Sequence, residues 1–108
     1  MNPAISADYR EIGRWLGNFV ASHVKREDPR LEVEVLADEA REGRSYGLRL
    51  VLGAARRPLA GEPPMEFPYP EVTDGRTRFA WCEALARRIR DEGRSLAAVA
   101  RSGGSRSA

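Results

Sequence analysis

Apolar and aromatic side chains recur every three or four positions near the start of the chain. They are Tyr9, Ile12, Trp15, Leu16, Phe19, Val20, His23 and Val24. This spacing predicts a helix with one apolar face. We expect Ser6 to cap its start at Ala7, because a serine oxygen can accept a backbone N–H there. The helix should end before Pro29, which disfavours helical geometry in the preceding residue.

Two later segments alternate apolar with polar residues, which is the period of a half-buried strand. Residues 31–37 read LEVEVLA and residues 45–53 read SYGLRLVLG. The polar segment between them includes Gly43, which can adopt the positive φ of a turn. The two strands are therefore expected to form an antiparallel hairpin. The residues expected to face the core are Leu31, Val33, Val35, Tyr46, Leu48, Leu50 and Leu52.

The second half of the chain predicts a loop followed by a second helix. Residues 54–64 are rich in proline and glycine, as is typical of a loop. The helix should be capped by Thr73 or Thr77, run to about Glu92 and stop at Gly93. Its apolar stripe consists of Phe79, Cys82, Leu85, Ala86 and Ile89.

The stretch MEFPYPEV, residues 65–72, has the composition of a strand but contains Pro68 and Pro70. In a strand, the two positions at which proline lacks an N–H donor would fall on the same edge, so the strand could pair on its other edge only. We therefore predict an outer strand of the sheet. An irregular extended segment that packs Phe67 and Tyr69 is the alternative. A proline-rich ligand is a weaker alternative, because no PxxP motif occurs.

The element order is thus α-β-β-(β)-α, with the proline-containing stretch as the bracketed strand. An antiparallel sheet with one apolar face needs cover, and two amphipathic helices can supply it from the same side. The predicted fold class is α+β, a two-layer sandwich whose antiparallel sheet is covered on one face by two helices. We expect residues 5–94 to form a single domain, and residues 95–108 a short helical turn and a disordered tail.

The composition of the 108 residues favours a small cytoplasmic protein of bacterial type. Cys82 is the only cysteine, so no internal disulfide can form. No apolar run approaches the roughly 20 residues that span a bilayer, and the N-terminus does not resemble a signal peptide. Lys25 is the single lysine among 18 basic residues, and the net charge is only +2. This arginine bias is typical of GC-rich genomes, so the arginine count is poor support for nucleic-acid binding.

Small and aromatic residues mark candidate interaction surfaces. Gly13 and Gly17 lie on the flank of the first helix's apolar stripe, where each glycine costs about 1 kcal/mol relative to alanine. Close packing against Ala80 and Ala84 of the second helix would offset that cost, and homodimerisation through the same groove is the alternative. A half-exposed tryptophan can anchor an interface or cover the rim of a core. The further candidates for contact with a protein partner are Trp81, Phe67 and Tyr69.

Four arginines on and before the second helix fall within a narrow arc and could hold phosphates. Glu83 and Asp91 are i,i+4 neighbours of Arg87 and can neutralise it, so a solvated face is the other interpretation. The element order also occurs in double-stranded RNA-binding domains, but the lysine-rich helix start and histidine loop of that family are missing here. The four arginines are Arg76, Arg87, Arg90 and Arg94.

The sequence predicts no catalytic, cofactor or metal site. His23 and Cys82 are the only residues of their types, and both are expected to face the core, where a thiol is usually inert. A lone histidine with scattered acids lacks the spacing of metal ligands. We therefore expect a non-enzymatic protein-interaction or accessory module, acting on an unknown protein partner or on itself. Weak nucleic-acid binding through the arginines is the alternative.

Overall fold

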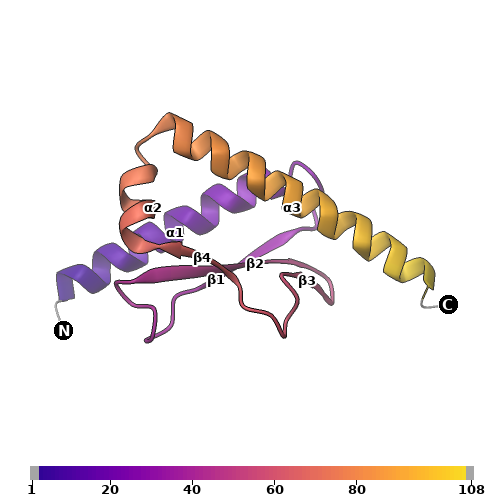
Figure 1. Cartoon of the computed structure of the whole chain (residues 1–108), viewed down its shortest axis with the longest axis horizontal. Coiled ribbons are helices and arrows are strands. Elements are labelled where there is room, and N and C mark those ends of the chain that lie inside the picture. The colour runs from indigo at the N-terminus through magenta and orange to yellow at the C-terminus, as the bar shows by residue number, and fades with distance from the viewer. Residues whose placement is uncertain (1–2, 107–108) are drawn as a thin grey trace.

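The computed structural model has the α+β fold that the sequence predicts (Figure 1). It describes the backbone of residues 3–106 and the side chains of residues 8–101. α1 and α3 lie on the same face of an antiparallel sheet. Within the described residues, no helix is long and apolar enough to cross a membrane. The elements in chain order are α1 (Pro3–Val24), β1 (Glu32–Leu36), β2 (Ser45–Leu52), β3 (Ala55–Arg57), β4 (Met65–Pro68), α2 (Tyr69–Gly75) and α3 (Phe79–Arg106).

The sheet is organised around β2, which has a neighbour along each edge. β1 pairs with one edge in antiparallel register, with Val35 opposite Leu48, so the predicted hairpin is confirmed. The other edge is shared end to end by β3, which pairs with residues 50–52, and β4, which pairs with residues 45–48. Among the described residues β1 pairs with β2 alone, so β1 is an outer strand.

The core lies between the helices and one face of the sheet. Glu32 and Glu34 of β1 point away from it and are exposed, which confirms the predicted assignment of faces. β2 points every second side chain inward, namely Tyr46, Leu48, Leu50 and Leu52. The helices contribute Tyr9, Ile12, Leu16, Val20 and Val24 from α1 and Leu85, Ile89, Leu96 and Ala97 from α3.

Two stacked tyrosines connect α1 to β2. The rings of Tyr9 and Tyr46 lie 4.5 Å apart with an angle of 8° between their planes. The Tyr46 hydroxyl donates to the carbonyl of Tyr9 at 2.6 Å, and the Tyr9 hydroxyl donates to the carbonyl of Ser45. Burial raises the pKa of both phenols, so both hydroxyls keep the protons that they donate. Because these polar groups are satisfied in the core, they fix the helix over the sheet at little cost.

Gly13 and Gly17 let α1 approach the sheet, not α3. A Cβ atom at Gly13 would lie 2.8 Å from Cε1 of Tyr46, and one at Gly17 would lie 3.1 Å from Cγ2 of Val35. The predicted packing of these glycines against two alanines of α3 is therefore wrong. Both of those alanines are exposed, namely Ala80 and Ala84.

The proline-containing stretch divides into a strand and a helix. Residues 65–68 form β4, which among the described residues pairs with β2 alone and is an outer strand as predicted. The predicted extension of the strand to Val72 is wrong, because α2 begins at Tyr69. Pro70 lies in the first turn of α2, where backbone N–H groups have no acceptor within the helix. The N–H that proline lacks therefore costs little stability there. Pro68 therefore ends a strand, and Pro70 begins a helix.

α1 starts earlier than predicted and ends as predicted. Its backbone is helical from Pro3, so Ser6 lies inside the helix and not at its cap, and the Ser6 side chain lies outside the described residues. The helix ends at Val24, ahead of a turn held by Asp28. This carboxylate accepts hydrogen bonds from the backbone N–H and the guanidinium of Arg30, each at 2.9 Å. These bonds hold the pKa of Asp28 at about 2.

α3 is longer than the sequence predicts. It continues through Gly93, where we expected it to stop, and it buries Leu96 in the core. Gly93 lets α3 approach the residues that follow α1, because a Cβ atom there would lie 3.3 Å from Cδ1 of Leu31. The backbone of the expected disordered tail is helical up to Arg106, and residues 107–108 lie outside the described part of the chain.

A single arginine holds the segment between β3 and β4. Residues 55–57, predicted as loop, form β3, and residues 58–64 then leave the sheet. Arg49, on the face of β2 that points away from the helices, is 12% exposed and lies 3.8 Å from the carboxylate of Glu34. Its side chain satisfies backbone groups that have no strand partner. Its Nη1 donates to three carbonyl oxygens at 2.7 to 3.2 Å, those of Pro58, Leu59 and Glu62.

We expect Arg49→Met to lower the free energy of unfolding by about 1.5–3 kcal/mol, the range for hydrogen bonds to a charged group. Methionine keeps part of the side-chain stem but donates no hydrogen bond. Urea denaturation measures the loss, and amide hydrogen exchange should accelerate in residues 58–64. Arg56→Met is the control, because Arg56 on the neighbouring strand donates only at 3.4 Å to the Ala54 carbonyl. Equal effects of the two substitutions would contradict the role of Arg49.

Candidate functional site

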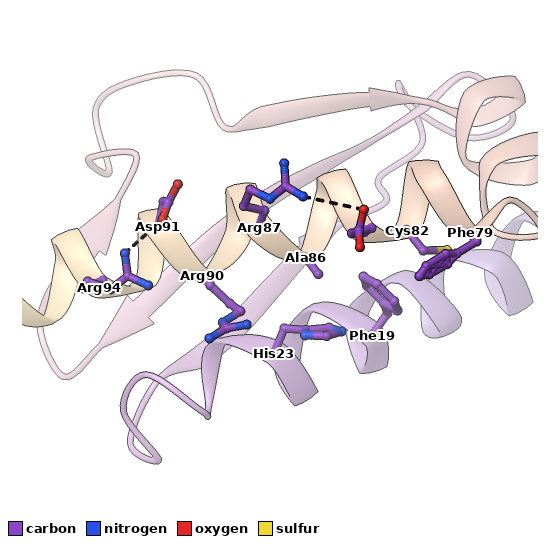
Figure 2. A pocket seen from close by; sticks show the side chains of 10 residues that line it. Phe19, His23, Phe79, Cys82, Ala86, Arg87, Arg90, Asp91 and Arg94 are labelled. Atoms are coloured by element: carbon purple, nitrogen blue, oxygen red, sulfur yellow. Dashed lines mark hydrogen bonds and ion pairs between the residues drawn. The ribbon is translucent and has the colours of Figure 1, made fainter.

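α1 and α3 enclose a groove of about 580 Å³, which we call the helix groove (Figure 2). It is lined by Phe19 and His23 of α1 and by the face of α3 from Phe79 to Arg94. Residues three or four apart on α3 share this face, so the groove follows the helix for several turns. Its position between the two longest helices makes it the first candidate for a binding site.

An exposed phenylalanine marks one end of the helix groove. Phe79, the first residue of α3, is 72% exposed, although the sequence pattern placed it in the core. Phe19, Cys82 and Ala86 line the groove with it and are partly buried. Phe19 is supported by Trp15, whose ring centroid lies 5.1 Å away. The groove therefore has an apolar floor that the described residues leave partly open.

Each of the three arginines on the helix groove has a carboxylate partner. Arg87 lies 3.6 Å from Glu83, and both side chains are exposed. Arg90 and Arg94 each donate from Nε to the carboxylate of Glu27 at 3.1 Å. The three guanidinium groups are thus accompanied by acids, which weakens the attraction of this face for phosphate. Arg76, the fourth arginine of the predicted stripe, lies apart from the helix groove, at the end of α2.

His23 and Cys82 both line the helix groove, but within residues 8–101 no hydrogen bond joins them. The Cys82 thiol lies 3.7 Å from the carbonyl oxygens of Gly75 and Arg76, to which it is a weak donor. Nδ1 of His23 is buried and has no hydrogen-bond partner in the described chain. Burial lowers the pKa of this imidazole, so it is neutral at physiological pH. Among the described residues, no three His, Cys, Asp or Glu side chains are grouped to hold a metal ion.

Two of the five predicted interaction residues are buried in this chain's own core, and the other three are partly buried. Phe67 is 3% exposed, and Gly13 is buried on the face of α1 that packs against Tyr46. Tyr69 is half-buried, with its ring centroid 5.6 Å from that of Tyr9. Gly17 is partly covered by β1. The structure therefore does not bring these residues together on one exposed surface.

Trp81 covers the rim of the core. Its ring centroid lies 6.4 Å from that of Trp15, and its Nε1 donates to the carboxylate of Glu71 at 3.1 Å. Gly75 leaves the space that the indole fills, because a Cβ atom there would lie 2.6 Å from Cε2 of the ring. Of the two roles that the sequence left open, the geometry favours the rim of the core over an interface anchor.

Comparison with known proteins adds no assignment. The chain matches no protein-family model, no curated protein and no solved structure. Any functional argument therefore rests on the surfaces of this chain itself.

We expect Glu27→Gln to remove a pH-dependent contribution to stability. Hydrogen bonds from Arg90 and Arg94 hold the pKa of Glu27 below its ordinary value, so its ionised form stabilises the fold. That contribution is present above the ordinary carboxylate pKa and is lost as the pH falls through the lowered one. The unfolding curves of the native protein and of Glu27→Gln should therefore differ at neutral pH and converge in acid.

Glu83→Gln is the matched control, because Glu83 makes only a 3.6 Å pair between exposed side chains on the same groove. Such exposed pairs contribute little to stability. If the free energies of unfolding of Glu27→Gln and the native protein differ by the same amount at neutral and acid pH, the stabilising role of ionised Glu27 is contradicted.

Proposed function

We propose that this protein is a non-enzymatic protein-interaction module, and that its helix groove binds a second copy of the chain. The observation that supports this proposal best is the 72% exposure of Phe79 at one end of a groove with an apolar floor. Exposing a phenylalanine forgoes the stabilisation that its burial would give. Burial in an interface recovers that free energy, and aromatic side chains are enriched at such sites.

The order of charges along α3 supports a second copy as the occupant. Phe79 and Glu83 lie on the N-terminal side of Ala86, and Arg90 and Arg94 lie on its C-terminal side. If two copies of α3 cross in antiparallel orientation at this small alanine, Glu83 of each copy lies near Arg90 of the other. The same crossing would also place each phenylalanine near the other copy's Arg94, where a guanidinium can pack on the ring. These two kinds of contact are therefore complementary under a twofold axis, while Arg87 of each copy keeps its own Glu83 as partner.

Nucleic-acid binding is less well supported. The three arginines on the groove are accompanied by Glu27, Glu83 and Asp91, so the face has little net charge. Phosphate binding depends on uncompensated cations, which release counterions when they bind.

We further propose a bacterial cytoplasmic location. The arginine-rich composition and the single cysteine, Cys82, support it, since a chain with one cysteine cannot form the internal disulfides typical of oxidising compartments.

We expect Phe79→Ser to weaken self-association by roughly tenfold or more, because truncation of an aromatic interface anchor commonly costs over 1 kcal/mol per site. Sedimentation equilibrium over a range of concentrations measures the dissociation constant. Val99→Ser is the matched control, since Val99 is also an exposed apolar residue of α3, 58% exposed, but lies outside the helix groove. It should dimerise like the native protein.

A native protein that stays monomeric at all concentrations would overturn the proposal, as would a Phe79→Ser protein with native affinity. Backbone amide spectra with a short RNA duplex at low and physiological salt test the alternative. Shifts over residues 76–94 that vanish with salt would support nucleic-acid binding instead.

A further inference from the structure

The opposite flank of α1 forms a second groove with the outer strand of the sheet. This edge groove has a volume of about 680 Å³ and is lined by α1 from Arg10 to Ala21, by Lys25 in the turn after α1, and by β1, including Glu32. At 100° per residue, this flank of α1 is on the other side of the helix from Phe19 and His23. It is therefore a separate surface from the helix groove.

One wall of the edge groove is a strand with a free edge. Among the described residues β1 pairs only with β2, so the backbone groups on its other edge have no strand partner. Such an edge can accept one more strand from another chain. Small residues keep the floor open beside it, since Gly17 and Ala21 of α1 lie next to Val33 and Val35 of β1.

The other wall carries cations without acidic partners. Arg10 and Arg14 of α1 and Lys25 just after it lie along one stripe, and none makes an ion pair with any described residue. The side-chain Nζ of Lys25 donates to the carbonyl of Pro29, at 3.2 Å. The arginines on the helix groove, by contrast, are all ion-paired. Glu32 of β1 also lines the groove but makes no ion pair with these cations in the described chain, so the edge groove has a net positive side next to a free strand edge.

We propose that the edge groove binds an extended acidic peptide segment of another protein, which adds to β1 as a further strand. Successive side chains of a strand point to opposite faces of a sheet. One set of side chains from the added strand would face α1, where Asp or Glu would meet the three cations. The other set would lie beside the exposed Glu32 and Glu34, where acids are disfavoured and neutral or basic residues fit.

The same charges argue against a second copy at this edge. Antiparallel pairing of β1 with itself would bring Glu32 and Glu34 of both copies onto one face, where like charges repel. Its inward residues would be Val33 and Val35, which offer nothing to the cations. The partner of the edge groove is therefore a different sequence, and this binding does not depend on dimerisation through the helix groove.

The test uses a capped peptide of alternating glutamate and threonine, titrated into isotopically labelled protein at low and physiological salt. Threonine favours strands, and alternation places every glutamate on one face. We expect amide shifts along the α1 flank and in residues 32–36, together with slower hydrogen exchange in residues 32–36. A peptide with the same residues in two blocks keeps the charge but loses the alternation, so it should bind more weakly.

The variant Arg10→Gln/Arg14→Gln/Lys25→Gln should bind the alternating peptide roughly tenfold more weakly or worse, because it loses three exposed charge pairs with the peptide. Arg44→Gln/Arg56→Gln/Arg101→Gln removes the same charge elsewhere and should bind like the native protein. Phe79→Ser should also bind normally, which separates this proposal from the one above.

The proposal is overturned by absence of binding at low salt, by equal loss in both triple variants, or by binding without change in residues 32–36. It is also overturned if a short RNA duplex binds the same flank more tightly than the peptide, because the cations would then be a phosphate site.

Discussion

The position of α1 depends on one contact, the ring of Tyr46 against Gly13. The ring occupies the space that any side chain at position 13 would need, since a Cβ atom there would lie 2.8 Å from Cε1. The same ring stacks on Tyr9, and its hydroxyl bonds to the Tyr9 carbonyl. Tyr46 therefore fixes the helix along its axis and sets its height above the sheet. A larger residue at position 13 would have to lift α1 or displace a ring that is held on two sides.

Both grooves follow from this placement. With α1 held low over β1 and β2, one flank lies beside α3 and the other beside the outer edge of the sheet (Figure 1). Gly93 brings α3 close to the end of α1, and Glu27 links the two through Arg90 and Arg94. The apolar floor of the helix groove and the cationic wall of the edge groove are thus opposite sides of one helix. A shift of α1 would change both surfaces together.

The sequence predicted the elements whose burial has a regular period. The alternation in β1 and β2 and the apolar stripe of α1 identified their core faces correctly, because each packs on one face only. It failed where a residue's local preference was overridden by its neighbours. Gly93 resembles a helix stop, yet it is a point of close approach to Leu31. Pro68 and Pro70 share the phase of one strand, yet the chain changes from strand to helix between them.

The surfaces were harder to predict than the fold. Phe79 belongs to the apolar stripe by its spacing, and only the three-dimensional placement of the first turn of α3 shows that it is exposed. The partners of Arg90 and Arg94 are distant in sequence, at Glu27, so a pattern along one helix could not reveal that they are neutralised. The free edge of β1 likewise requires the strand order, which alternation alone does not give.

A double-mutant cycle between Gly13 and Tyr46 tests the contact on which this arrangement depends. Urea denaturation would give the free energy of unfolding for the native protein, Gly13→Ala, Tyr46→Val and the double variant. We predict that Gly13→Ala destabilises the native protein, because overpacking against a held ring outweighs the gain of about 1 kcal/mol in helix propensity. In the Tyr46→Val background the ring is gone, and Gly13→Ala should instead stabilise by up to about 1 kcal/mol. The same effect of Gly13→Ala in both backgrounds would contradict the claim that this contact positions α1.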